Sequence, residues 1–121
     1  MHIHESAENY LEAILALSEK GAVRSIDVAQ YLSFSKPSVS RAMSLLRENG
    51  YVIMDEDGFL TLTESGMEIA ERIYERHRLL TKWLVHLGVD PDVAAEDACR
   101  IEHDLSVESF DAIKKFILEH S

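Results

Sequence analysis

A short stretch near the end of the chain combines three side chains that bind transition metals. Cys99, Glu102 and His103 stand at spacings of i, i+3 and i+4, so on a helix they share one face and can converge on one point. Thiolate, carboxylate and imidazole are among the few protein groups that bind a divalent first-row ion at neutral pH. The spacing predicts a metal site; the alternative is a buried apolar cysteine beside a solvated Glu-His pair.

Two predicted helices elsewhere in the chain carry further candidate ligands. Residues 6–20 have an apolar stripe and, on the opposite side, oxygen-bearing side chains that include Asn9 and Glu12. Such a polar side either faces water or binds a cation. Residues 64–87 form a longer helical pattern in which His77 falls in register with the apolar positions. That histidine is either a hydrogen-bonded core residue or a metal ligand.

Composition restricts the class of protein. A chain of 121 residues with 46% hydrophobic residues is long enough for one ordinary domain or a small domain with a helical extension. The single cysteine excludes an intrachain disulfide and fits a reducing compartment. Residues 1–5 lack the charged lead and apolar run of a signal peptide, and no segment is long enough to span a membrane. We therefore expect a cytoplasmic protein with no membrane partner.

The distribution of charge leaves room for a nucleic-acid partner. The net charge of −10 argues against one, because nucleic acids attract basic surfaces. Residues 22–50, however, hold four basic side chains against two acidic ones, which makes this segment +2 in an acidic chain. Charge alone does not decide the matter.

The same segment has the pattern of a helix-turn-helix. Ser25 is the expected N-cap of a helix that ends near Leu32, and Ser35 is the expected N-cap of a second helix. The start of the second helix presents the side chains expected to contact double-stranded DNA, which are Ser35, Lys36, Pro37, Ser38, Ser40 and Arg41. The alternative is a pair of packed helices with a polar exterior.

A predicted β-hairpin follows the second helix directly. Residues 51–54 and 59–62 are apolar runs, and the segment between them contains an Asp-Gly turn. A helix-turn-helix followed by a hairpin is a winged helix. The fold class is therefore mainly α with a small β-hairpin wing, and the acidic tip of the wing makes it a poor phosphate contact.

Two more helices are expected after Pro91. Residues 91–104 carry the Cys99 stretch, and residues 106–119 carry an apolar stripe. That stripe comprises Val107, Phe110, Ile113 and Ile117. It is expected to meet its copy in a homodimer; burial inside one subunit is the competing interpretation.

Taken together, these residues resemble a known family. The winged helix, the segment Arg76-His77-Arg78 and the segment Cys99-Arg100-Ile101-Glu102-His103, in this order, are similar to the metal-dependent repressors related to the diphtheria toxin repressor and the manganese transport regulator. The resemblance covers nearly the whole chain. It implies a homodimeric repressor of metal-uptake genes that binds operator DNA when metal is bound, with a winged-helix DNA-binding domain over residues 1–64 and a helical metal-binding and dimerisation domain over residues 65–121.

The resemblance also implies a set of metal ligands. Carried over to this chain, they are Asn9, Glu12, His77, Cys99, Glu102 and His103. Position 9 is aspartate in manganese-type relatives and methionine in iron-type ones, and position 99 is glutamate in the former and cysteine in the latter. Asn9 and Cys99 make this chain a hybrid. The expected effector is Mn(II) or Fe(II), with Co(II), Ni(II) or Zn(II) as substitutes in vitro.

Two other classes of function compete with this interpretation. A metalloenzyme needs an open coordination position and a base beside a substrate pocket, and the sequence has neither an H-E-x-x-H motif nor a phosphate-binding glycine loop; we expect no enzyme. A metal-independent winged-helix regulator would use Cys99 and His77 as core residues. Unchanged DNA affinity in chelator would favour that alternative.

Overall fold

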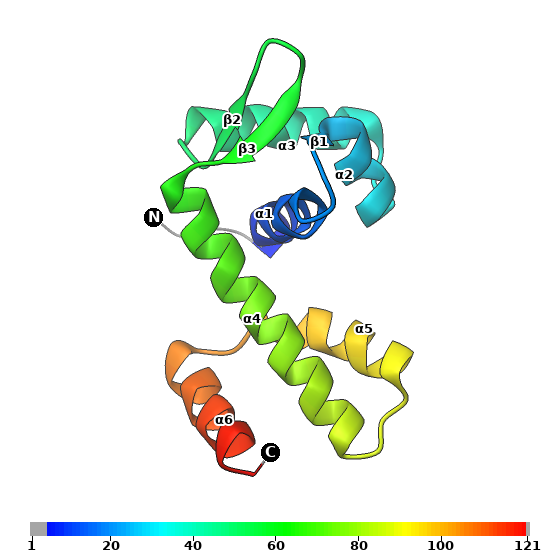
Figure 1. The fold of residues 1–121 in the computed structure, drawn as a ribbon, viewed down its shortest axis with the longest axis vertical. Helices are drawn as coiled ribbons and strands as arrows, with labels where there is room; N and C mark the ends of the chain where they lie inside the picture. The colour runs from blue at the N-terminus through cyan, green and yellow to red at the C-terminus, as the bar shows by residue number, and fades with distance from the viewer. Residues whose placement is uncertain (1–4, 121) are drawn as a thin grey trace. The chain divides into compact units, whose positions relative to one another are not determined.

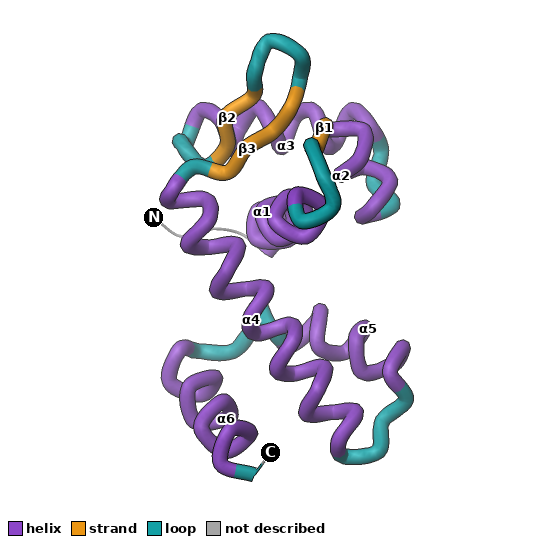
Figure 2. Tube along the Cα trace, viewed as in Figure 1, coloured by secondary structure: helices purple, strands orange, loops and turns teal. Residues whose placement is uncertain are grey.

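The computed structural model describes residues 5–120, in two compact units, Met1–Glu71 and Arg72–Ser121. The expectation about a leader segment falls largely on residues 1–4, outside the described part. Figures 1 and 2 show the elements in chain order, which are α1 (Glu5–Ser18), β1 (Val23–Arg24), α2 (Ser25–Leu32), α3 (Lys36–Glu48), β2 (Val52–Met54), β3 (Phe59–Leu62), α4 (Glu64–His86), α5 (Pro91–Ile101) and α6 (Val107–Glu119). Among the described residues, no helix has the length and apolar character needed to cross a bilayer.

The helix-turn-helix of the first unit consists of α2 and α3. Ser35 caps α3 as predicted, because its hydroxyl accepts a hydrogen bond from the Ser38 backbone N–H at 3.3 Å. The prediction for α2 was wrong by one residue. Arg24 is the N-cap there, and its backbone N–H donates to the Asp27 carboxylate at 2.9 Å. The acidic residue three positions into the helix thus satisfies the terminus, and Ser25 begins the helix instead of capping it.

The predicted hairpin is confirmed as the wing, formed by β2 and β3. The Asp55 carboxylate accepts hydrogen bonds from the backbone N–H groups of Asp57 and Phe59, each at 2.9 Å, and Gly58 adopts a positive φ of 86°. An aspartate that closes the turn on its own backbone and a glycine free of Cβ strain are what this tight connection needs. The strand β1, which was not predicted, pairs antiparallel with β3 and gives the strand order β1-β3-β2.

The core of the first unit lies among α1, α2, α3 and the sheet. It is formed by apolar side chains that share one face of each helix, including Leu11, Ile14, Val28, Val39 and Met43, all of which are at most 1% exposed. Helix α4 joins this core through Ala70. The amphipathic pattern of α3 therefore buries one face and leaves the other available for a partner.

The second unit packs the C-terminal part of α4 against α5 and α6 around Leu80, Ala98 and Phe110. This arrangement corrects the expectation for the last helix, because Phe110 (4% exposed) and Ile117 (7%) are buried inside the chain. The competing interpretation holds for these two side chains. The large apolar side chains that remain exposed on α6 are Val107, Phe116 and Leu118.

Candidate metal centre and DNA-binding surface

The end of α5 brings the predicted ligand Glu102 into the interior. The helix was expected to continue to residue 104 but ends at Ile101, with Glu102 as its C-cap. Because Glu102 keeps right-handed helical angles (φ −57°, ψ −27°), its side chain still projects as a helical residue would. Its carboxylate is fully buried, at 0% exposure.

The Glu102 carboxylate contacts two imidazoles. Its Oε2 lies 2.9 Å from Nδ1 of His77, on α4, and its Oε1 lies 3.3 Å from Nε2 of His103, the next residue along the chain. A carboxylate taken out of water is costly unless positive charge compensates it. Carboxylate and imidazole are also the donors that divalent first-row ions accept. The residues therefore fit a metal ion, and the second unit supplies three of the six predicted ligands as one cluster.

The other three predicted ligands belong to two helices, α1 and α5. Cys99 is exposed, on the last turn of α5, three residues before the buried Glu102. Asn9 and Glu12 lie on α1, in the first unit, and both are half-buried. Their spacing suggested that Cys99 and Glu102 share one environment, but the thiol is exposed and the carboxylate is buried.

Sequence reasoning missed one residue that contacts this region. The Arg76 side chain is 5% exposed, and its Nη1 donates to the backbone carbonyl of Glu102 at 2.9 Å. The signal that could have found it is its spacing, three residues after Ile73 and four before Leu80, both buried on α4. A charged residue in register with an apolar stripe is rare unless it has buried partners.

The candidate DNA-binding surface is the start of α3. Lys36, Pro37, Ser40 and Arg41 are exposed there, as is Ser35, while Ser38 is half-buried. The Ser35 hydroxyl donates to the Ser38 hydroxyl at 2.8 Å and accepts from the Ser38 backbone, so these two side chains complete the helix cap. Lys36, Ser40 and Arg41 are exposed and can contact a DNA groove. They lie near a helix N-terminus, where the helix dipole favours phosphate.

Arg41→Ala is expected to weaken operator binding by about 1–3 kcal/mol if Arg41 reads a base, and to leave metal affinity unchanged. The exposed guanidinium lies on the solvent side of α3, in a different unit from His77 and Glu102. Fluorescence anisotropy with a labelled duplex gives the DNA affinity. Arg78→Ala, which removes an exposed arginine from α4, is the matched control. Full operator affinity in Arg41→Ala would refute this assignment.

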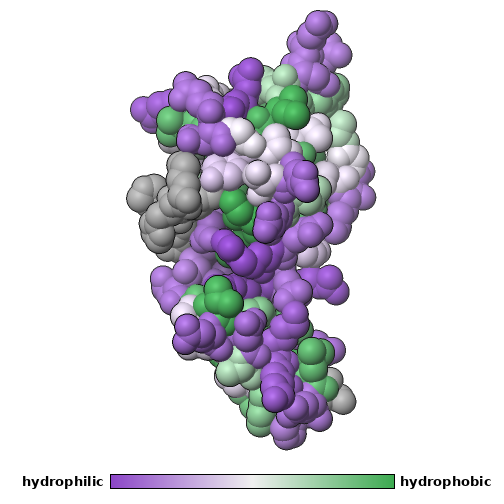
Figure 3. All heavy atoms as spheres, turned by 90° about the vertical axis from the view of Figure 1, so that its left-hand side faces the viewer, coloured by the Kyte–Doolittle hydropathy of each residue, from purple (hydrophilic) through white to green (hydrophobic). Residues whose placement is uncertain are grey.

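The wing offers little positive charge to DNA. Its tip, with the exposed Asp55, Glu56 and Asp57, forms the hydrophilic projection at the top of the surface in Figure 3. Acidic side chains repel phosphate. That the tip avoids the DNA backbone remains a prediction.

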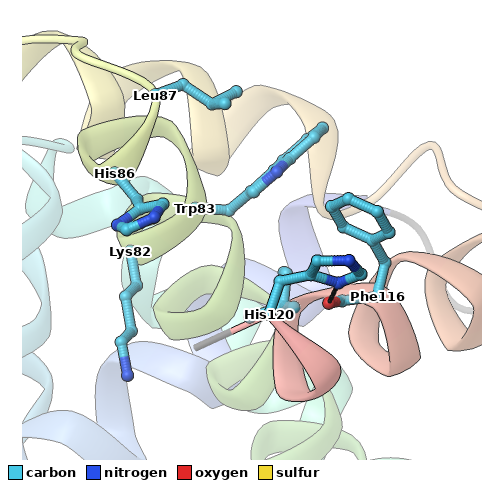
Figure 4. A pocket seen from close by; sticks show the side chains of 7 residues that line it. Lys82, Trp83, His86, Leu87, Phe116 and His120 are labelled. Carbon is cyan, nitrogen blue, oxygen red and sulfur yellow. Dashed lines mark hydrogen bonds between the residues drawn. The ribbon is translucent and has the colours of Figure 1, made fainter.

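A separate pocket in the second unit lies between α4 and α6 (Figure 4). Trp83 and His86 of α4 line it with Leu87, the residue after that helix, and Phe116 of α6 lines it with His120, the C-cap of α6. The imidazole of His120 stacks on Phe116, with ring centroids 4.0 Å apart, and its Nδ1 lies 2.9 Å from the Phe116 backbone oxygen. The pocket contains none of the six predicted ligands.

Two models of known protein families match this chain. Residues 2–60 match the family model of the iron-dependent repressor N-terminal DNA-binding domain, and residues 63–120 match that of the iron-dependent repressor metal-binding and dimerisation domain. The resemblance inferred from the sequence, and the fold class with it, is confirmed.

Individual relatives point the same way. The transcriptional regulator MntR of Salmonella typhimurium is 34% identical over 120 residues, which cover 98% of this chain and 76% of that protein. The structure of the manganese regulator SloR superimposes with a TM-score of 0.81 at 30% identity, covering 97% of this chain and 54% of that one. A manganese-dependent transcriptional repressor in complex with manganese gives 0.84 at 31% identity, covering 92% and 52%.

The chain thus spans about three quarters of the curated relative and about half of each solved one. The two family models account for nearly all of its residues. The chain belongs to the iron-dependent repressor family of metal-dependent, DNA-binding transcriptional regulators.

Proposed function

We propose that this chain is a homodimeric repressor that binds operator DNA when Mn(II) or Fe(II) is bound, and that it controls genes for metal uptake. The observation that carries the proposal is the fully buried Glu102 carboxylate between the imidazoles of His77 and His103. It lies in the part of the chain that matches a metal-binding and dimerisation domain. Operator DNA would place the protein in the cytoplasm.

We propose that the six predicted ligands hold the ion. His77, Glu102 and His103 form the cluster already described, and Cys99, on the last turn of α5, is three residues before the C-cap Glu102. Asn9 and Glu12 of α1 are proposed as the remaining ligands on the strength of the family resemblance. When bound, the ion supplies the positive charge that neutralises the carboxylates and ties α1 to the metal-binding unit.

The residues of the chain explain why such binding would act as a switch. In the proposed ligand set, the carboxylates of Glu12 and Glu102 would repel each other without a cation to compensate them. Helix α1 also contributes Leu11 and Ile14 to the core on which α3 packs, so holding α1 constrains the recognition helix. A dimer requires its two recognition helices about one DNA turn apart. An ion that binds the competent arrangement about 100-fold better shifts the equilibrium by about 2.7 kcal/mol.

Cys99 gives the proposed site a mixed character. A thiolate is a soft ligand that favours Fe(II), Co(II) or Zn(II), whereas the oxygens of Glu12, Glu102 and Asn9 favour harder ions such as Mn(II). One sulfur among several oxygens and two imidazoles should tilt the site toward Fe(II) without excluding Mn(II). Co(II), Ni(II) and Zn(II) are expected to substitute in vitro.

Cys99→Glu is expected to shift activation toward Mn(II), because a hard oxygen replaces the thiolate. The measurement is the ratio of operator affinities in Fe(II) and in Mn(II), made without oxygen. Co(II) bound to the unaltered chain should also show a thiolate charge-transfer band that the variant lacks. Identical Co(II) spectra and identical activation ratios would remove Cys99 from the ligand set.

The experiment that tests the proposed function is selection of duplexes from a random DNA library with the full chain. Selection in Mn(II), in anaerobic Fe(II) and in chelator should enrich a two-fold symmetric sequence only where metal is present. The affinity for that duplex is then measured across the divalent ions. Enrichment of the same sequence at the same affinity in chelator would instead show a metal-independent winged-helix regulator.

A further inference from the structure

The side chain of Arg76 holds the backbone of the turn that carries two of the proposed ligands. Its Nη1 donates to the carbonyl of Glu102 and to the carbonyl of Leu105, each at 2.9 Å. Its guanidinium carbon also lies 5.0 Å from the centre of the Phe110 ring, which starts the packed face of α6. One buried side chain thus links the end of α5, the turn of residues 102–105 and the beginning of α6.

This turn needs support from outside. Helix α5 ends at Ile101, and the last carbonyls of a helix have no partner within it. Within the turn, the backbone N–H of Asp104 donates to the Ile101 carbonyl at 3.0 Å. Arg76 supplies donors for the carbonyls at positions 102 and 105. Both ends of the segment that contains Glu102 and His103 are therefore held by the same nitrogen.

Two adjacent residues of α4 contact Glu102, one at its side chain and one at its backbone. His77 Nδ1 lies 2.9 Å from the carboxylate, and Arg76 Nη1 lies 2.9 Å from the backbone carbonyl. Fixing both the main chain and the side-chain end of one residue leaves its carboxylate little freedom to turn. Loss of a group that orients a ligand without touching the ion typically lowers metal affinity by about 10- to 100-fold.

The positive charge of Arg76 does not itself favour metal binding. A buried cation beside a cation-binding cluster opposes binding of the ion through its charge. The two hydrogen bonds that Nη1 donates to the turn go to neutral carbonyls. What these two bonds contribute to metal binding is therefore the position of the turn.

We propose that Arg76 is a positioning residue that sets the metal affinity of the centre by fixing the 102–105 turn and so orienting Glu102 and His103. The inference rests on the proposed function, because it assigns Arg76 a role toward the same site. It concerns a property that can be measured without DNA.

The test compares two substitutions at Arg76 with the same two at Arg78. Arg76→Lys keeps the charge but loses the rigid fork, and Arg76→Met also loses the donors. Arg78 lies on the other side of His77, is exposed, and has its guanidinium carbon 5.6 Å from the Tyr74 ring centre. Mn(II) is titrated into each chain of 121 residues, and the free ion is followed by electron paramagnetic resonance. Thermal unfolding in chelator reports the stability of each metal-free chain.

The expected result is a graded rise in the Mn(II) dissociation constant, about tenfold for Arg76→Lys and about 100-fold for Arg76→Met, with the Arg78 variants unchanged. Backbone amides of the 102–105 turn should also exchange hydrogen faster in Arg76→Lys. Where Arg76→Met fails to fold, Arg76→Lys decides.

Two results would overturn the inference. A lower unfolding temperature with an unchanged dissociation constant would make Arg76 a purely structural residue while leaving the proposed function intact. An unaltered chain that leaves Mn(II) and anaerobic Fe(II) free would overturn the proposed function and this inference together.

Discussion

Glu102→Gln is expected to leave a folded chain whose affinity for divalent ions falls by about 100-fold or more. Glutamine has nearly the same shape but carries no charge, and it keeps donors and acceptors for His77 and His103, the two groups that Glu102 contacts. Because the replaced carboxylate is fully buried, removing its charge also removes a desolvation cost. Glu102→Gln should therefore lower the metal affinity, while the free energy of unfolding of the metal-free chain should rise or stay the same.

Thermal unfolding with and without Mn(II) measures both effects. Saturation to about 100 times the dissociation constant should stabilise the unaltered chain by about 2.7 kcal/mol and Glu102→Gln by almost nothing. In chelator, the unfolding temperature of Glu102→Gln should be no lower than that of the unaltered chain. Glu96→Gln, an exposed position on the same helix, controls for the loss of one negative charge. A variant that Mn(II) stabilises as much as the unaltered chain would exclude Glu102 as a ligand.

Gly66→Ala is expected to destabilise the first unit by about 1–3 kcal/mol or more. Gly66 is buried in the first turn of α4, and a Cβ at this position would overlap the backbone carbonyl oxygen of Tyr51. That oxygen also accepts a hydrogen bond from the Thr63 N–H at 3.1 Å, so it cannot move without disturbing the start of α4. Without the clash, alanine would stabilise the helix by about 1 kcal/mol relative to glycine. A loss of stability in Gly66→Ala therefore identifies the clash.

Urea denaturation followed by circular dichroism gives this free energy of unfolding. Ser65→Ala, at the exposed neighbouring position, tests the effect of an alanine in the same turn without the clash. Equal stability of Gly66→Ala and Ser65→Ala would contradict this prediction and mean that the Tyr51 backbone shifts to accommodate the added Cβ.

Local signals were enough to predict most of the winged helix. The Ser35 cap and the Asp-Gly turn of the wing each depend on hydrogen bonds between residues at most four positions apart. Such local causes can be recognised in the sequence itself. The strand β1 was missed because its two residues exist as a strand only through pairing with β3. Arg24 was missed as a cap because the satisfying group is a side chain three residues later, Asp27.

The candidate site was predictable to the extent that it depends on residue type and helical register. His77, Glu102 and His103 were identified in this way, and the structure brings them together. The end of α5 was not predicted from local signals, and the Arg76 side chain, which donates to two carbonyls of the turn after it, is distant in sequence. The burial of Phe110 likewise follows from packing against Leu80 and Ala98, which no periodicity in α6 alone distinguishes from an intersubunit face.

The pairing of β1 with β3 has a consequence for the order in which the winged helix folds. The β2–β3 hairpin joins residues at most ten positions apart, whereas β1 pairs Val23 with Leu60 and Arg24 with Phe59, across the whole helix-turn-helix. Closing that long loop costs chain entropy before any contact repays it. The hairpin and the helix pair can each form from local contacts. We therefore expect β1 to pair with β3 last, together with the contact between the Arg24 guanidinium carbon and the Phe59 ring, whose centre is 4.3 Å away.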